Sequence, residues 1–448
     1  MASTYLTSGN LSSAGNQKKW TISFWVKRAK LGVTQGILDY SVNSTNYYNF
    51  TFKSTDGLTM FNNDGGTVSY ELEPSMKFRD TSGWYHIVHQ YDSEQATESN
   101  RAKLWVNGVQ QSSWTNENYP SQGANTKIPN SGYPINIGRQ YRANTNVQYF
   151  DGSLSHFHFC DGYAYSASDF GQTDANGVWK IKTSPSVTYG TNGFFILKDG
   201  NSVTDQSGNG NNFTVGGGTL TNTEDSPSNV FNTMTDLAKS SSVNLANGSC
   251  TTIGNSNSSS GRCRSNWNLP NSGKWYFEYK MIADNQGNTY PNSGIKYNAE
   301  IFYNPENSDS TADIFVYGTY SGELIHVNNG THITAGAPAT SGDIFGWCVD
   351  MDNGAIYIHQ NGTYINSGNP ESGASKTGAI YSFTPSDYPN MCVVSNEYGN
   401  SETQYNFGNG YFSATAVASA GTNASGIGIF EYDVPTGYTA LSTKGLNL

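Results

Sequence analysis

Aromatic side chains in polar segments of the first half of the chain have the make-up of a sugar-binding surface. Trp114 and Tyr119 stand in the segment Trp-Thr-Asn-Glu-Asn-Tyr, and Tyr141 follows Arg139 in Arg-Gln-Tyr-Arg. Sugars stack their apolar faces on such rings, while asparagine, aspartate and arginine side chains bind the hydroxyl groups. We therefore expect Trp114, Tyr119, Arg139 and Tyr141 to bind a ligand from polar loops between strands. The alternative is that these rings pack against a second domain or a neighbouring subunit.

Glu71 and Glu73 are the acidic residues that could act as a catalytic pair, and we expect both to be exposed on a loop or strand edge. Glycoside hydrolysis uses two such carboxylates. The chain has no Gly-x-Ser-x-Gly elbow, no P-loop lysine motif and no His-Glu-x-x-His. We therefore expect a protein that is not an enzyme and has no catalytic residues.

No group of residues has the spacing of a complete metal site. His156 and His158 share one face of a predicted strand about 7 Å apart, but two ligands do not make a zinc site. We expect no metal site of this kind and no cofactor. Calcium could still bind at the edges of the fold through Asp64, Asp151 or Asp205 together with backbone carbonyls.

The composition indicates a folded protein with a polar, uncharged surface. The chain has 448 residues and a net charge of −11; charged residues make up 13% and aromatic residues another 13%, including 30 tyrosines. Disordered chains lack aromatics, and surfaces rich in Tyr, Ser, Asn and Gly suit adhesive contacts. An acidic chain without basic clusters argues against nucleic acid as a partner.

The first six residues have neither a basic nor an apolar region of a signal peptide, and no apolar run is long enough to cross a membrane. We therefore expect synthesis in a reducing cytoplasm and no membrane insertion. Cys250 and Cys263 flank a Ser/Asn-rich loop and could pair, but free cysteines are the simpler expectation there.

Short strands joined by tight turns predict an all-β fold. In residues 342–365, an almost entirely apolar run is followed by Asp352-Asn353-Gly354 and then by an alternating run, and Asn361-Gly362 follows. Asn-Gly readily forms two-residue hairpin turns, so we expect two successive turns and no calcium loop at Asp350. Residues 20–28 and 84–92 alternate in the same way.

The first half resembles the laminin-G-like branch of the concanavalin A-type jelly rolls. The resemblance rests on Trp-Thr-Ile-Ser-Phe-Trp-Val-Lys, Trp-Tyr-His-Ile-Val, Lys-Leu-Trp-Val-Asn-Gly-Val, Ile-Asn-Ile-Gly and Phe-Asp-Gly-Ser-Leu-Ser-His-Phe, at residues 20–27, 84–88, 103–109, 135–138 and 150–157. It implies a two-sheet sandwich whose relatives often bind glycans and sometimes calcium. Some of these relatives are glycosidases with Glu-x-Asp-x-x-Glu on one strand. The nearest match, Glu431-Tyr432-Asp433, lacks the third carboxylate because residue 436 is threonine.

The second half resembles a SPRY domain. It has Gly-Lys-Trp-Tyr-Phe-Glu at residues 273–278, the hairpin of residues 342–365, and Tyr-Asn-Phe-Gly at residues 405–408. We therefore expect two tandem antiparallel β-sandwiches: residues 1–215 of concanavalin A type, a linker over residues 216–240, and residues 241–448 of SPRY type.

Residues 431–448, with Pro-Thr-Gly-Tyr-Thr-Ala-Leu, resemble the ending of SPRY-bearing structural proteins of tailed bacteriophages. This resemblance implies a non-enzymatic protein on the virion exterior, in a fibre or spike, that attaches to host surface glycans. The expected partners are other virion proteins and copies of this chain, with a trimer expected from general fibre architecture. One alternative is a structural decoration or cement protein of capsid or tail, and a more distant one is a glycan-cleaving enzyme.

Overall fold

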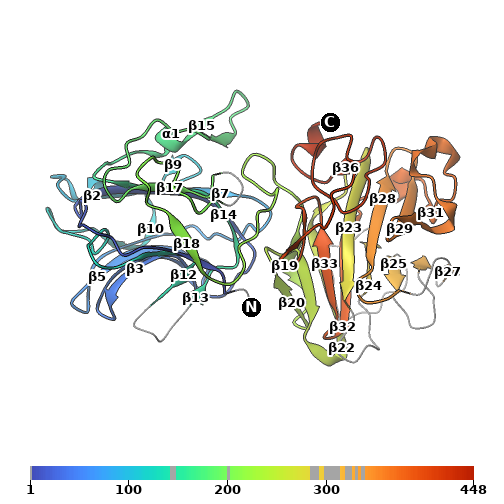
Figure 1. Ribbon diagram of the computed structural model, residues 1–448, viewed down its shortest axis with the longest axis horizontal. Helices are drawn as coiled ribbons and strands as arrows, with labels where there is room; N and C mark the ends of the chain where they lie inside the picture. The colour runs from blue at the N-terminus through green and yellow to red at the C-terminus, as the bar shows by residue number, and fades with distance from the viewer. Residues whose placement is uncertain are drawn as a thin grey trace. The chain divides into compact units, whose positions relative to one another are not determined.

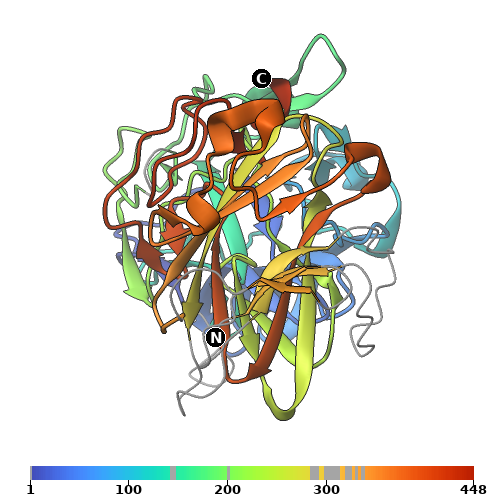
Figure 2. The same cartoon turned by 90° about the vertical axis from the view of Figure 1, so that its right-hand side faces the viewer.

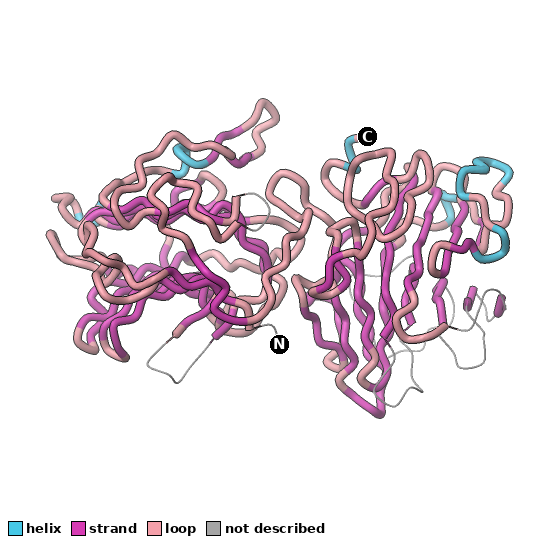
Figure 3. The backbone as a smooth tube through the Cα atoms, viewed as in Figure 1, coloured by secondary structure: helices cyan, strands magenta, loops and turns pink. Residues whose placement is uncertain are grey.

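The computed structural model of the protein describes residues 3–141, 148–198, 202–282, 292–296, 313–317, 325–327, 331–333 and 339–448. Within these residues nearly all regular structure is β-strand, accompanied by a four-residue α-helix and short 3-10 turns (Figure 3). Contacts divide the chain into two compact units, Met1–Asn222 and Thr223–Leu448. The predicted fold class, all-β with antiparallel sheets in two tandem sandwiches, is confirmed.

The first unit is built from an eight-stranded and a six-stranded sheet, which lie as two layers in Figure 1. The eight-stranded sheet has the order β10 (Trp114–Asn118), β6 (Thr67–Pro74), β5 (Leu58–Asp64), β4 (Asn46–Phe52), β3 (Gln35–Asn43), β11 (Ile135–Ile137), β1 (Tyr5–Ser8) and β18 (Phe213–Gly217). The six-stranded sheet has the order β17 (Phe194–Ile196), β14 (Gly152–Asp161), β2 (Lys19–Arg28), β7 (Tyr85–Asp92), β8 (Ala102–Val106) and β9 (Val109–Gln110).

Short elements complete this unit. They are β12 (Arg139–Gln140) with β13 (Gln148–Tyr149), β15 (Gly171–Thr173) with β16 (Trp179–Ile181), α1 (Ala167–Phe170) and η1 (Glu98–Asn100).

The core of the first unit forms because alternate residues of each strand point to the same side of a sheet. Trp20 and Phe24 of β2 meet Tyr48 and Phe50 of β4, and all four are completely buried. Trp20 packs edge-on against Tyr48, and its Nε1 donates to Thr126 Oγ1 at 2.9 Å. Each such burial contributes about 1.5–3 kcal/mol, so the core fixes which face of each sheet remains available for other contacts.

The outer face of the six-stranded sheet is also covered. His86 stacks between Trp25 and Trp179, with ring centroids 4.7 and 5.9 Å away, and burial lowers the pKa of His86 to about 3. His89, three residues along β7, points into the core instead and is hydrogen-bonded to Tyr70. The two histidines therefore occupy opposite faces of one strand.

The second unit also has two large sheets. The seven-stranded sheet has the order β19 (Met234–Lys239), β22 (Ser256–Asn268), β32 (Cys392–Gly399), β24 (Asn292–Lys296), β25 (Asp313–Tyr317), β26 (Ile325–Val327) and β27 (Thr331–Ile333). The nine-stranded sheet comprises β20 (Val243–Ala246), β21 (Thr251–Gly254), β33 (Glu402–Asn406), β23 (Lys274–Ile282), β28 (Ile344–Asp350), β29 (Ala355–Gln360), β30 (Thr363–Tyr364), β31 (Tyr381–Ser382) and β36 (Thr439–Ala440).

Figure 1 shows β23 (yellow) between β33 and β28, and Figure 2 turns the strands of this unit toward the viewer. The short elements are β34 (Tyr411–Phe412), β35 (Thr415–Ala416), η2 (Ile365–Ser367), η3 (Pro370–Ser375), η4 (Pro385–Asp387) and η5 (Gly445–Asn447).

The predicted hairpin of residues 342–365 is present as β28 and β29, but its first turn differs from the prediction. Asp350 pairs with Ala355, so four residues connect the strands, and the predicted two-residue turn is wrong. Only Gly354 of the four has positive φ, at 70°, and Asn353 instead donates from Nδ2 to Asp350 Oδ2 at 2.8 Å. The Asp350 carboxylate also lies 3.0 Å from Lys274 Nζ, so this loop is a turn held by its own side chains.

The second turn follows the prediction. Gln360 pairs with Thr363, and both intervening residues have positive φ, 49° for Asn361 and 82° for Gly362. This is the backbone conformation of a two-residue hairpin turn with Asn-Gly at its centre.

The range predicted as a linker, residues 216–240, contains the end of β18 and all of β19, and the boundary between the units falls inside it. All five cysteines, Cys250 and Cys263 among them, are buried, and none of them forms a disulfide bond. Of the helices in the described residues, none has the length and apolar character needed to cross a bilayer.

Candidate functional site

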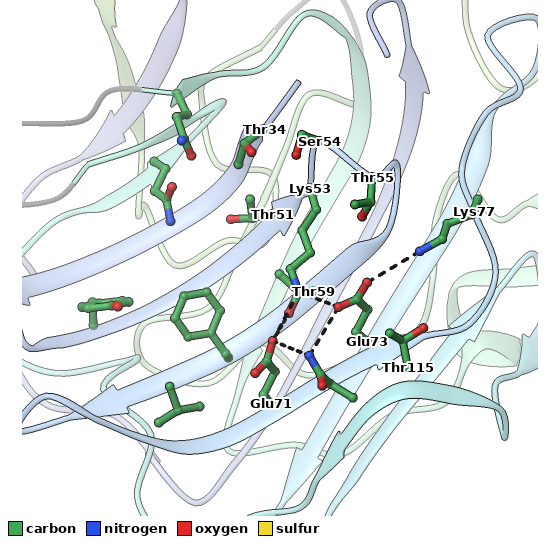
Figure 4. Close-up of a pocket in the computed structure, with 16 residues that line it drawn as sticks. Thr34, Thr51, Lys53, Ser54, Thr55, Thr59, Glu71, Glu73, Lys77 and Thr115 are labelled. Carbon is green, nitrogen blue, oxygen red and sulfur yellow. Dashed lines mark hydrogen bonds and ion pairs between the residues drawn. The ribbon is translucent and has the colours of Figure 1, made fainter. Parts of the chain in front are cut away.

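A groove of about 790 Å³ lies on the face of the eight-stranded sheet that points away from the core (Figure 4). It is lined by β4, β5, β6, β10, β12, β13 and adjoining loops, through Thr34, Tyr47, Thr51, Lys53, Ser54, Thr55, Thr59, Phe61, Val68, Glu71, Glu73, Lys77, Thr115, Asn116, Gln140 and Gln148. Its volume is within the range of small-molecule sites in proteins.

The floor of the groove follows from strand alternation in β4. Tyr48, Phe50 and Phe52 enter the core, so Tyr47 and Thr51 must point to the other side. Pairing between strands then sets rows across the sheet: Thr51 is opposite Thr59 on β5, and Glu73 on β6 is opposite Asn116 on β10. Polar residues that are far apart in sequence thus come together on one surface.

A charged network occupies one part of the groove. Lys53 Nζ lies 2.5 Å from Glu73 Oε2 and 3.6 Å from Glu71 Oε1, and Lys77 Nζ lies 3.7 Å from Glu73 Oε1. Asn116 Nδ2 donates to both carboxylates, at 3.2 and 3.4 Å. Figure 4 shows Lys53 reaching both glutamates while Lys77 approaches Glu73 from another side. Two cations and two anions therefore neutralise each other here.

An aromatic pair supplies the apolar part of the lining. Tyr47 and Phe61 pack edge to face with ring centroids 5.5 Å apart, and Val68, also in the lining, is 39% exposed. Hydroxyl, amide and aromatic groups thus share one surface, a combination that can bind a ligand with both hydroxyl groups and apolar faces.

A buried hydrogen-bonded chain supports the groove beside β4. Gln140 Nε2 donates to Asn49 Oδ1 at 2.7 Å, Asn49 Nδ2 donates to Asp39, and Ser41 Oγ donates to the other oxygen of Asp39 at 2.9 Å. Asn49 and Asp39 are fully buried. Satisfied buried networks rigidify a structure, so these hydrogen bonds hold the Gln140 side chain in one position at the groove.

The structure places Trp114 and Tyr119 against the core of the first unit. Both are partly buried and contact the core cluster, and burial together with the Glu117 carboxylate raises the pKa of Tyr119 to about 12. The predicted position of Trp114 in a loop is wrong, because it belongs to β10. Its neighbours Thr115 and Asn116 line the groove instead.

Arg139 and Tyr141 come together beside Tyr5 of β1. The Arg139 guanidinium lies 3.5 Å from the ring centroid of Tyr5 and 4.6 Å from that of Tyr141, and its Nη2 donates to Asn136 Oδ1 at 2.8 Å. Between them in sequence, Gln140 lines the groove. The sequence therefore identified two of the segments that border the groove, whereas binding by Trp114, Tyr119, Arg139 and Tyr141 themselves stays a prediction.

The expectation that Glu71 and Glu73 are both exposed is wrong. Glu73 is 3% exposed because β10 pairs alongside it, and Glu71 is half-buried. Sequence reasoning also missed Thr51 and Lys53, although a signal was present. The polar residues of Asn46–Phe52 alternate with the aromatic residues that build the core, which marks a strand with one face outside the core.

The residues considered for metals have other contacts. His156 and His158 have ring centroids 6.5 Å apart. Asp64 Oδ1 lies 2.7 Å from Lys127 Nζ, and Asp205 accepts from the backbone N–H groups of residues 195, 207 and 211. No group of three His, Cys, Asp or Glu side chains that could hold a metal occurs within the described residues.

The second unit contains two buried glutamates whose partners belong to the fold. Glu278 accepts hydrogen bonds from the backbone N–H groups of residues 431 and 432, and burial raises its pKa to about 7. Glu397 accepts from three hydroxyl groups. Glu431 and Asp433 each accept a backbone N–H at 2.6 Å, from residues 418 and 422. These contacts stabilise loops and strands of the unit itself.

Residues 1–169 match the family model described as the concanavalin A-like lectin/glucanases superfamily. No protein in the curated set matches the sequence. The family match agrees with the laminin-G-like resemblance of the first half.

Several solved structures are similar to this chain at low sequence identity and low TM-score. The SPRY domain of human HERC1 is 15% identical over 38% of this chain and 96% of that chain, with a TM-score of 0.30. The heptameric SAP-like pentraxin from Limulus polyphemus is 17% identical over 37% of this chain and 72% of that one, with a TM-score of 0.28. Domains LG4-5 of the mouse laminin alpha1 chain are 10% identical over 96% of this chain and 92% of that one, with a TM-score of 0.29.

Proposed function

We propose that this protein binds glycans without cleaving them, through the groove on the eight-stranded sheet. The observation that carries the proposal is the lining itself, in which the Tyr47–Phe61 pair stands beside hydroxyl and amide side chains. A sugar presents the matching surfaces, apolar C–H faces and a rim of hydroxyl groups. The match of residues 1–169 to a lectin and glucanase superfamily supports this ligand class.

The arrangement of Glu71 and Glu73 favours binding over hydrolysis. Both oxygens of Glu73 face lysine ammonium groups, and Glu71 Oε1 accepts from Thr59 and Asn116. A glycosidase needs one carboxyl group that is free to deliver a proton to the leaving oxygen. These carboxylates instead orient Lys53 and Asn116.

The biological setting that we propose is the exterior of a tailed-phage virion, in a fibre or spike that attaches to host glycans. Support comes from the resemblance of residues 431–448 to the ends of phage structural proteins. The proposed partners are other virion proteins and copies of this chain, with a trimer as the expected assembly. A structural decoration or cement role on capsid or tail is the second candidate.

Glycan binding is tested with the full chain on an array of bacterial surface polysaccharides, comparing Asn116→Ala with Asn118→Ala. Both asparagines are exposed on β10, but only Asn116 lines the groove. We expect the first variant to lose about threefold to tenfold in affinity and the second to match the native chain. Equal binding by all three would contradict the assignment of the groove.

The remaining alternatives have separate readouts. Release of reducing ends by the native chain, abolished in Glu73→Gln, would establish an enzyme. Cross-linking within intact virions should leave the first unit without neighbours if it attaches to hosts. Enclosure of that unit by capsid or tail subunits would favour the cement role.

A further inference from the structure

Two buried polar atoms in the groove lack a hydrogen-bond partner within the described part of the chain: Thr51 Oγ1 and Gln148 Oε1. Thr51 is only 3% exposed, and both residues line the groove. A buried polar group without a partner is costly, and each such atom in a folded protein calls for an explanation. A bound molecule that hydrogen-bonds to both atoms would remove the cost.

The chemistry of the two atoms restricts what that molecule can be. An amide oxygen such as Gln148 Oε1 can only accept, so the ligand must present a donor to it. A threonine hydroxyl can donate or accept, so Thr51 tolerates either. Hydroxyl groups of a ligand meet both requirements. Gln148 is opposite Gln140 in the β12–β13 pair, so its side chain stays beside the network that holds Gln140.

The charges of the lining restrict the ligand further. Lys53 and Lys77 are the cationic residues of the described lining, and both face Glu71 or Glu73. An acidic sugar would have to break these ion pairs and approach the two carboxylates. Recognition of carboxylate, sulfate or phosphate groups in proteins uses available arginine or lysine donors, and the residues described in this lining include no arginine.

We propose that the groove is specific for uncharged glycans, whose hydroxyl groups bind Thr51 Oγ1 and Gln148 Oε1 while the lysine–glutamate network excludes acidic ones. This inference rests on the proposed glycan-binding function and specifies its substrate class. Thr51 and Gln148 are assigned as direct ligand contacts, and the apolar sugar face is assigned to the Tyr47–Phe61 pair.

The test uses calorimetric titration of the full chain with oligosaccharides of equal length: neutral glucans, acidic galacturonans and basic glucosamine polymers. We expect the neutral probes to bind and the charged ones to bind at least tenfold more weakly. Equal or stronger binding of a charged probe would overturn the inference and leave glycan binding intact. Binding of no probe, on this panel and on the polysaccharide array, would overturn the proposed function itself.

Thr51→Val separates a ligand contact from a structural role. Valine keeps the shape of threonine and removes a hydroxyl that has no partner among the described residues, so the unfolding midpoint should stay equal or rise. Affinity for the neutral probe should fall about tenfold. Thr67→Val, at an exposed position of β6 outside the groove, is the matched control and should bind as the native chain does.

Unchanged affinity in Thr51→Val would overturn the assignment of that hydroxyl. A lower unfolding midpoint together with reduced binding would show a structural role and overturn it as well. Gln148→Leu provides a second, independent test, since it removes the proposed acceptor. It should lower the affinity for the same neutral probe.

Discussion

The buried carboxyl group of Glu397 gives a quantitative prediction for the stability of the second unit. Glu397 lies on β32 with no exposed surface, and it accepts hydrogen bonds from Thr252, Thr403 and Ser401 at 2.6, 2.7 and 2.9 Å. Burial raises its pKa from the ordinary 4.5 to about 8, against the opposing effect of the three hydroxyl donors. The perturbation that tests this environment is Glu397→Gln, which resembles the protonated form and cannot ionise.

The sign of the effect follows from proton linkage. Because the pKa is higher in the folded state, the folded chain binds more protons than the unfolded chain between pH 4.5 and about 8. The stabilisation is fully present below the unfolded pKa and is lost as pH rises through the folded one. The loss between about pH 5 and about pH 8 is on the order of 3 kcal/mol. Glu278 adds a parallel slope, because burial raises its pKa to about 7.

The assay is urea unfolding of the native chain and of Glu397→Gln across this pH range. The free energy is taken from the unfolding transition that shifts between the two proteins. Glu278 is present in both proteins, so its contribution cancels in the difference. We expect the free energy of unfolding of the variant, relative to that of the native chain, to increase by on the order of 3 kcal/mol from about pH 5 to about pH 8. Glu224→Gln, at an exposed position of the same unit, is the control and should show no such gain.

The reasoning would be refuted if the difference between the native chain and Glu397→Gln stayed constant with pH. Such a result would mean that the three hydroxyl donors compensate fully for the burial of the carboxylate. A difference of the opposite slope would mean that they stabilise the ionised form more than water does.

Three further substitutions test contacts that hold each unit together. Arg28→Met should lower the free energy of unfolding of the first unit by about 3–5 kcal/mol, because it leaves Asp56, 3.1 Å from the fully buried guanidinium, without that partner; denaturant titration measures it. Gly354→Ala should lower the melting temperature of the second unit, because the φ of Gly354 is 70° and a Cβ atom would lie 2.0 Å from a backbone carbonyl oxygen. Gly9→Ala, with open space around it, should leave the melting temperatures unchanged in the same scan. Asp205→Ala should lower the free energy of unfolding by about 1–3 kcal/mol, because several backbone N–H groups lose their acceptor. Hydrogen exchange should become faster at residues 195, 207 and 211, and unchanged exchange there would contradict this role.

The fold class and the two-sided character of the strands could be read from the sequence. Alternation alone places Trp20, Tyr48 and Phe50 in a core and leaves Thr51 on the other face, because successive side chains of a strand point to opposite sides. The Asn361-Gly362 turn is equally local, since two positive φ angles suffice to close it. In both cases the controlling interaction lies within a few residues.

The identical dipeptide Asn353-Gly354 adopts a different conformation, and the reason is not local. Asp350 pairs with Lys274 on another strand and accepts from Asn353, so a four-residue loop replaces the two-residue turn. Sequence pattern contains the turn residues but not the partner strand that selects between two turn lengths.

The candidate site shows the same division. The sequence determined two segments that border the groove and the alternation that leaves polar residues off the core. Only the tertiary structure decided that Thr51, Glu73 and Gln148, separated by up to 97 positions in the chain, line one surface and that Trp114 packs inward. Burial and unsatisfied hydrogen bonding depend on which strands become neighbours. Strand order is set by the packing of the whole sheet rather than by the local sequence.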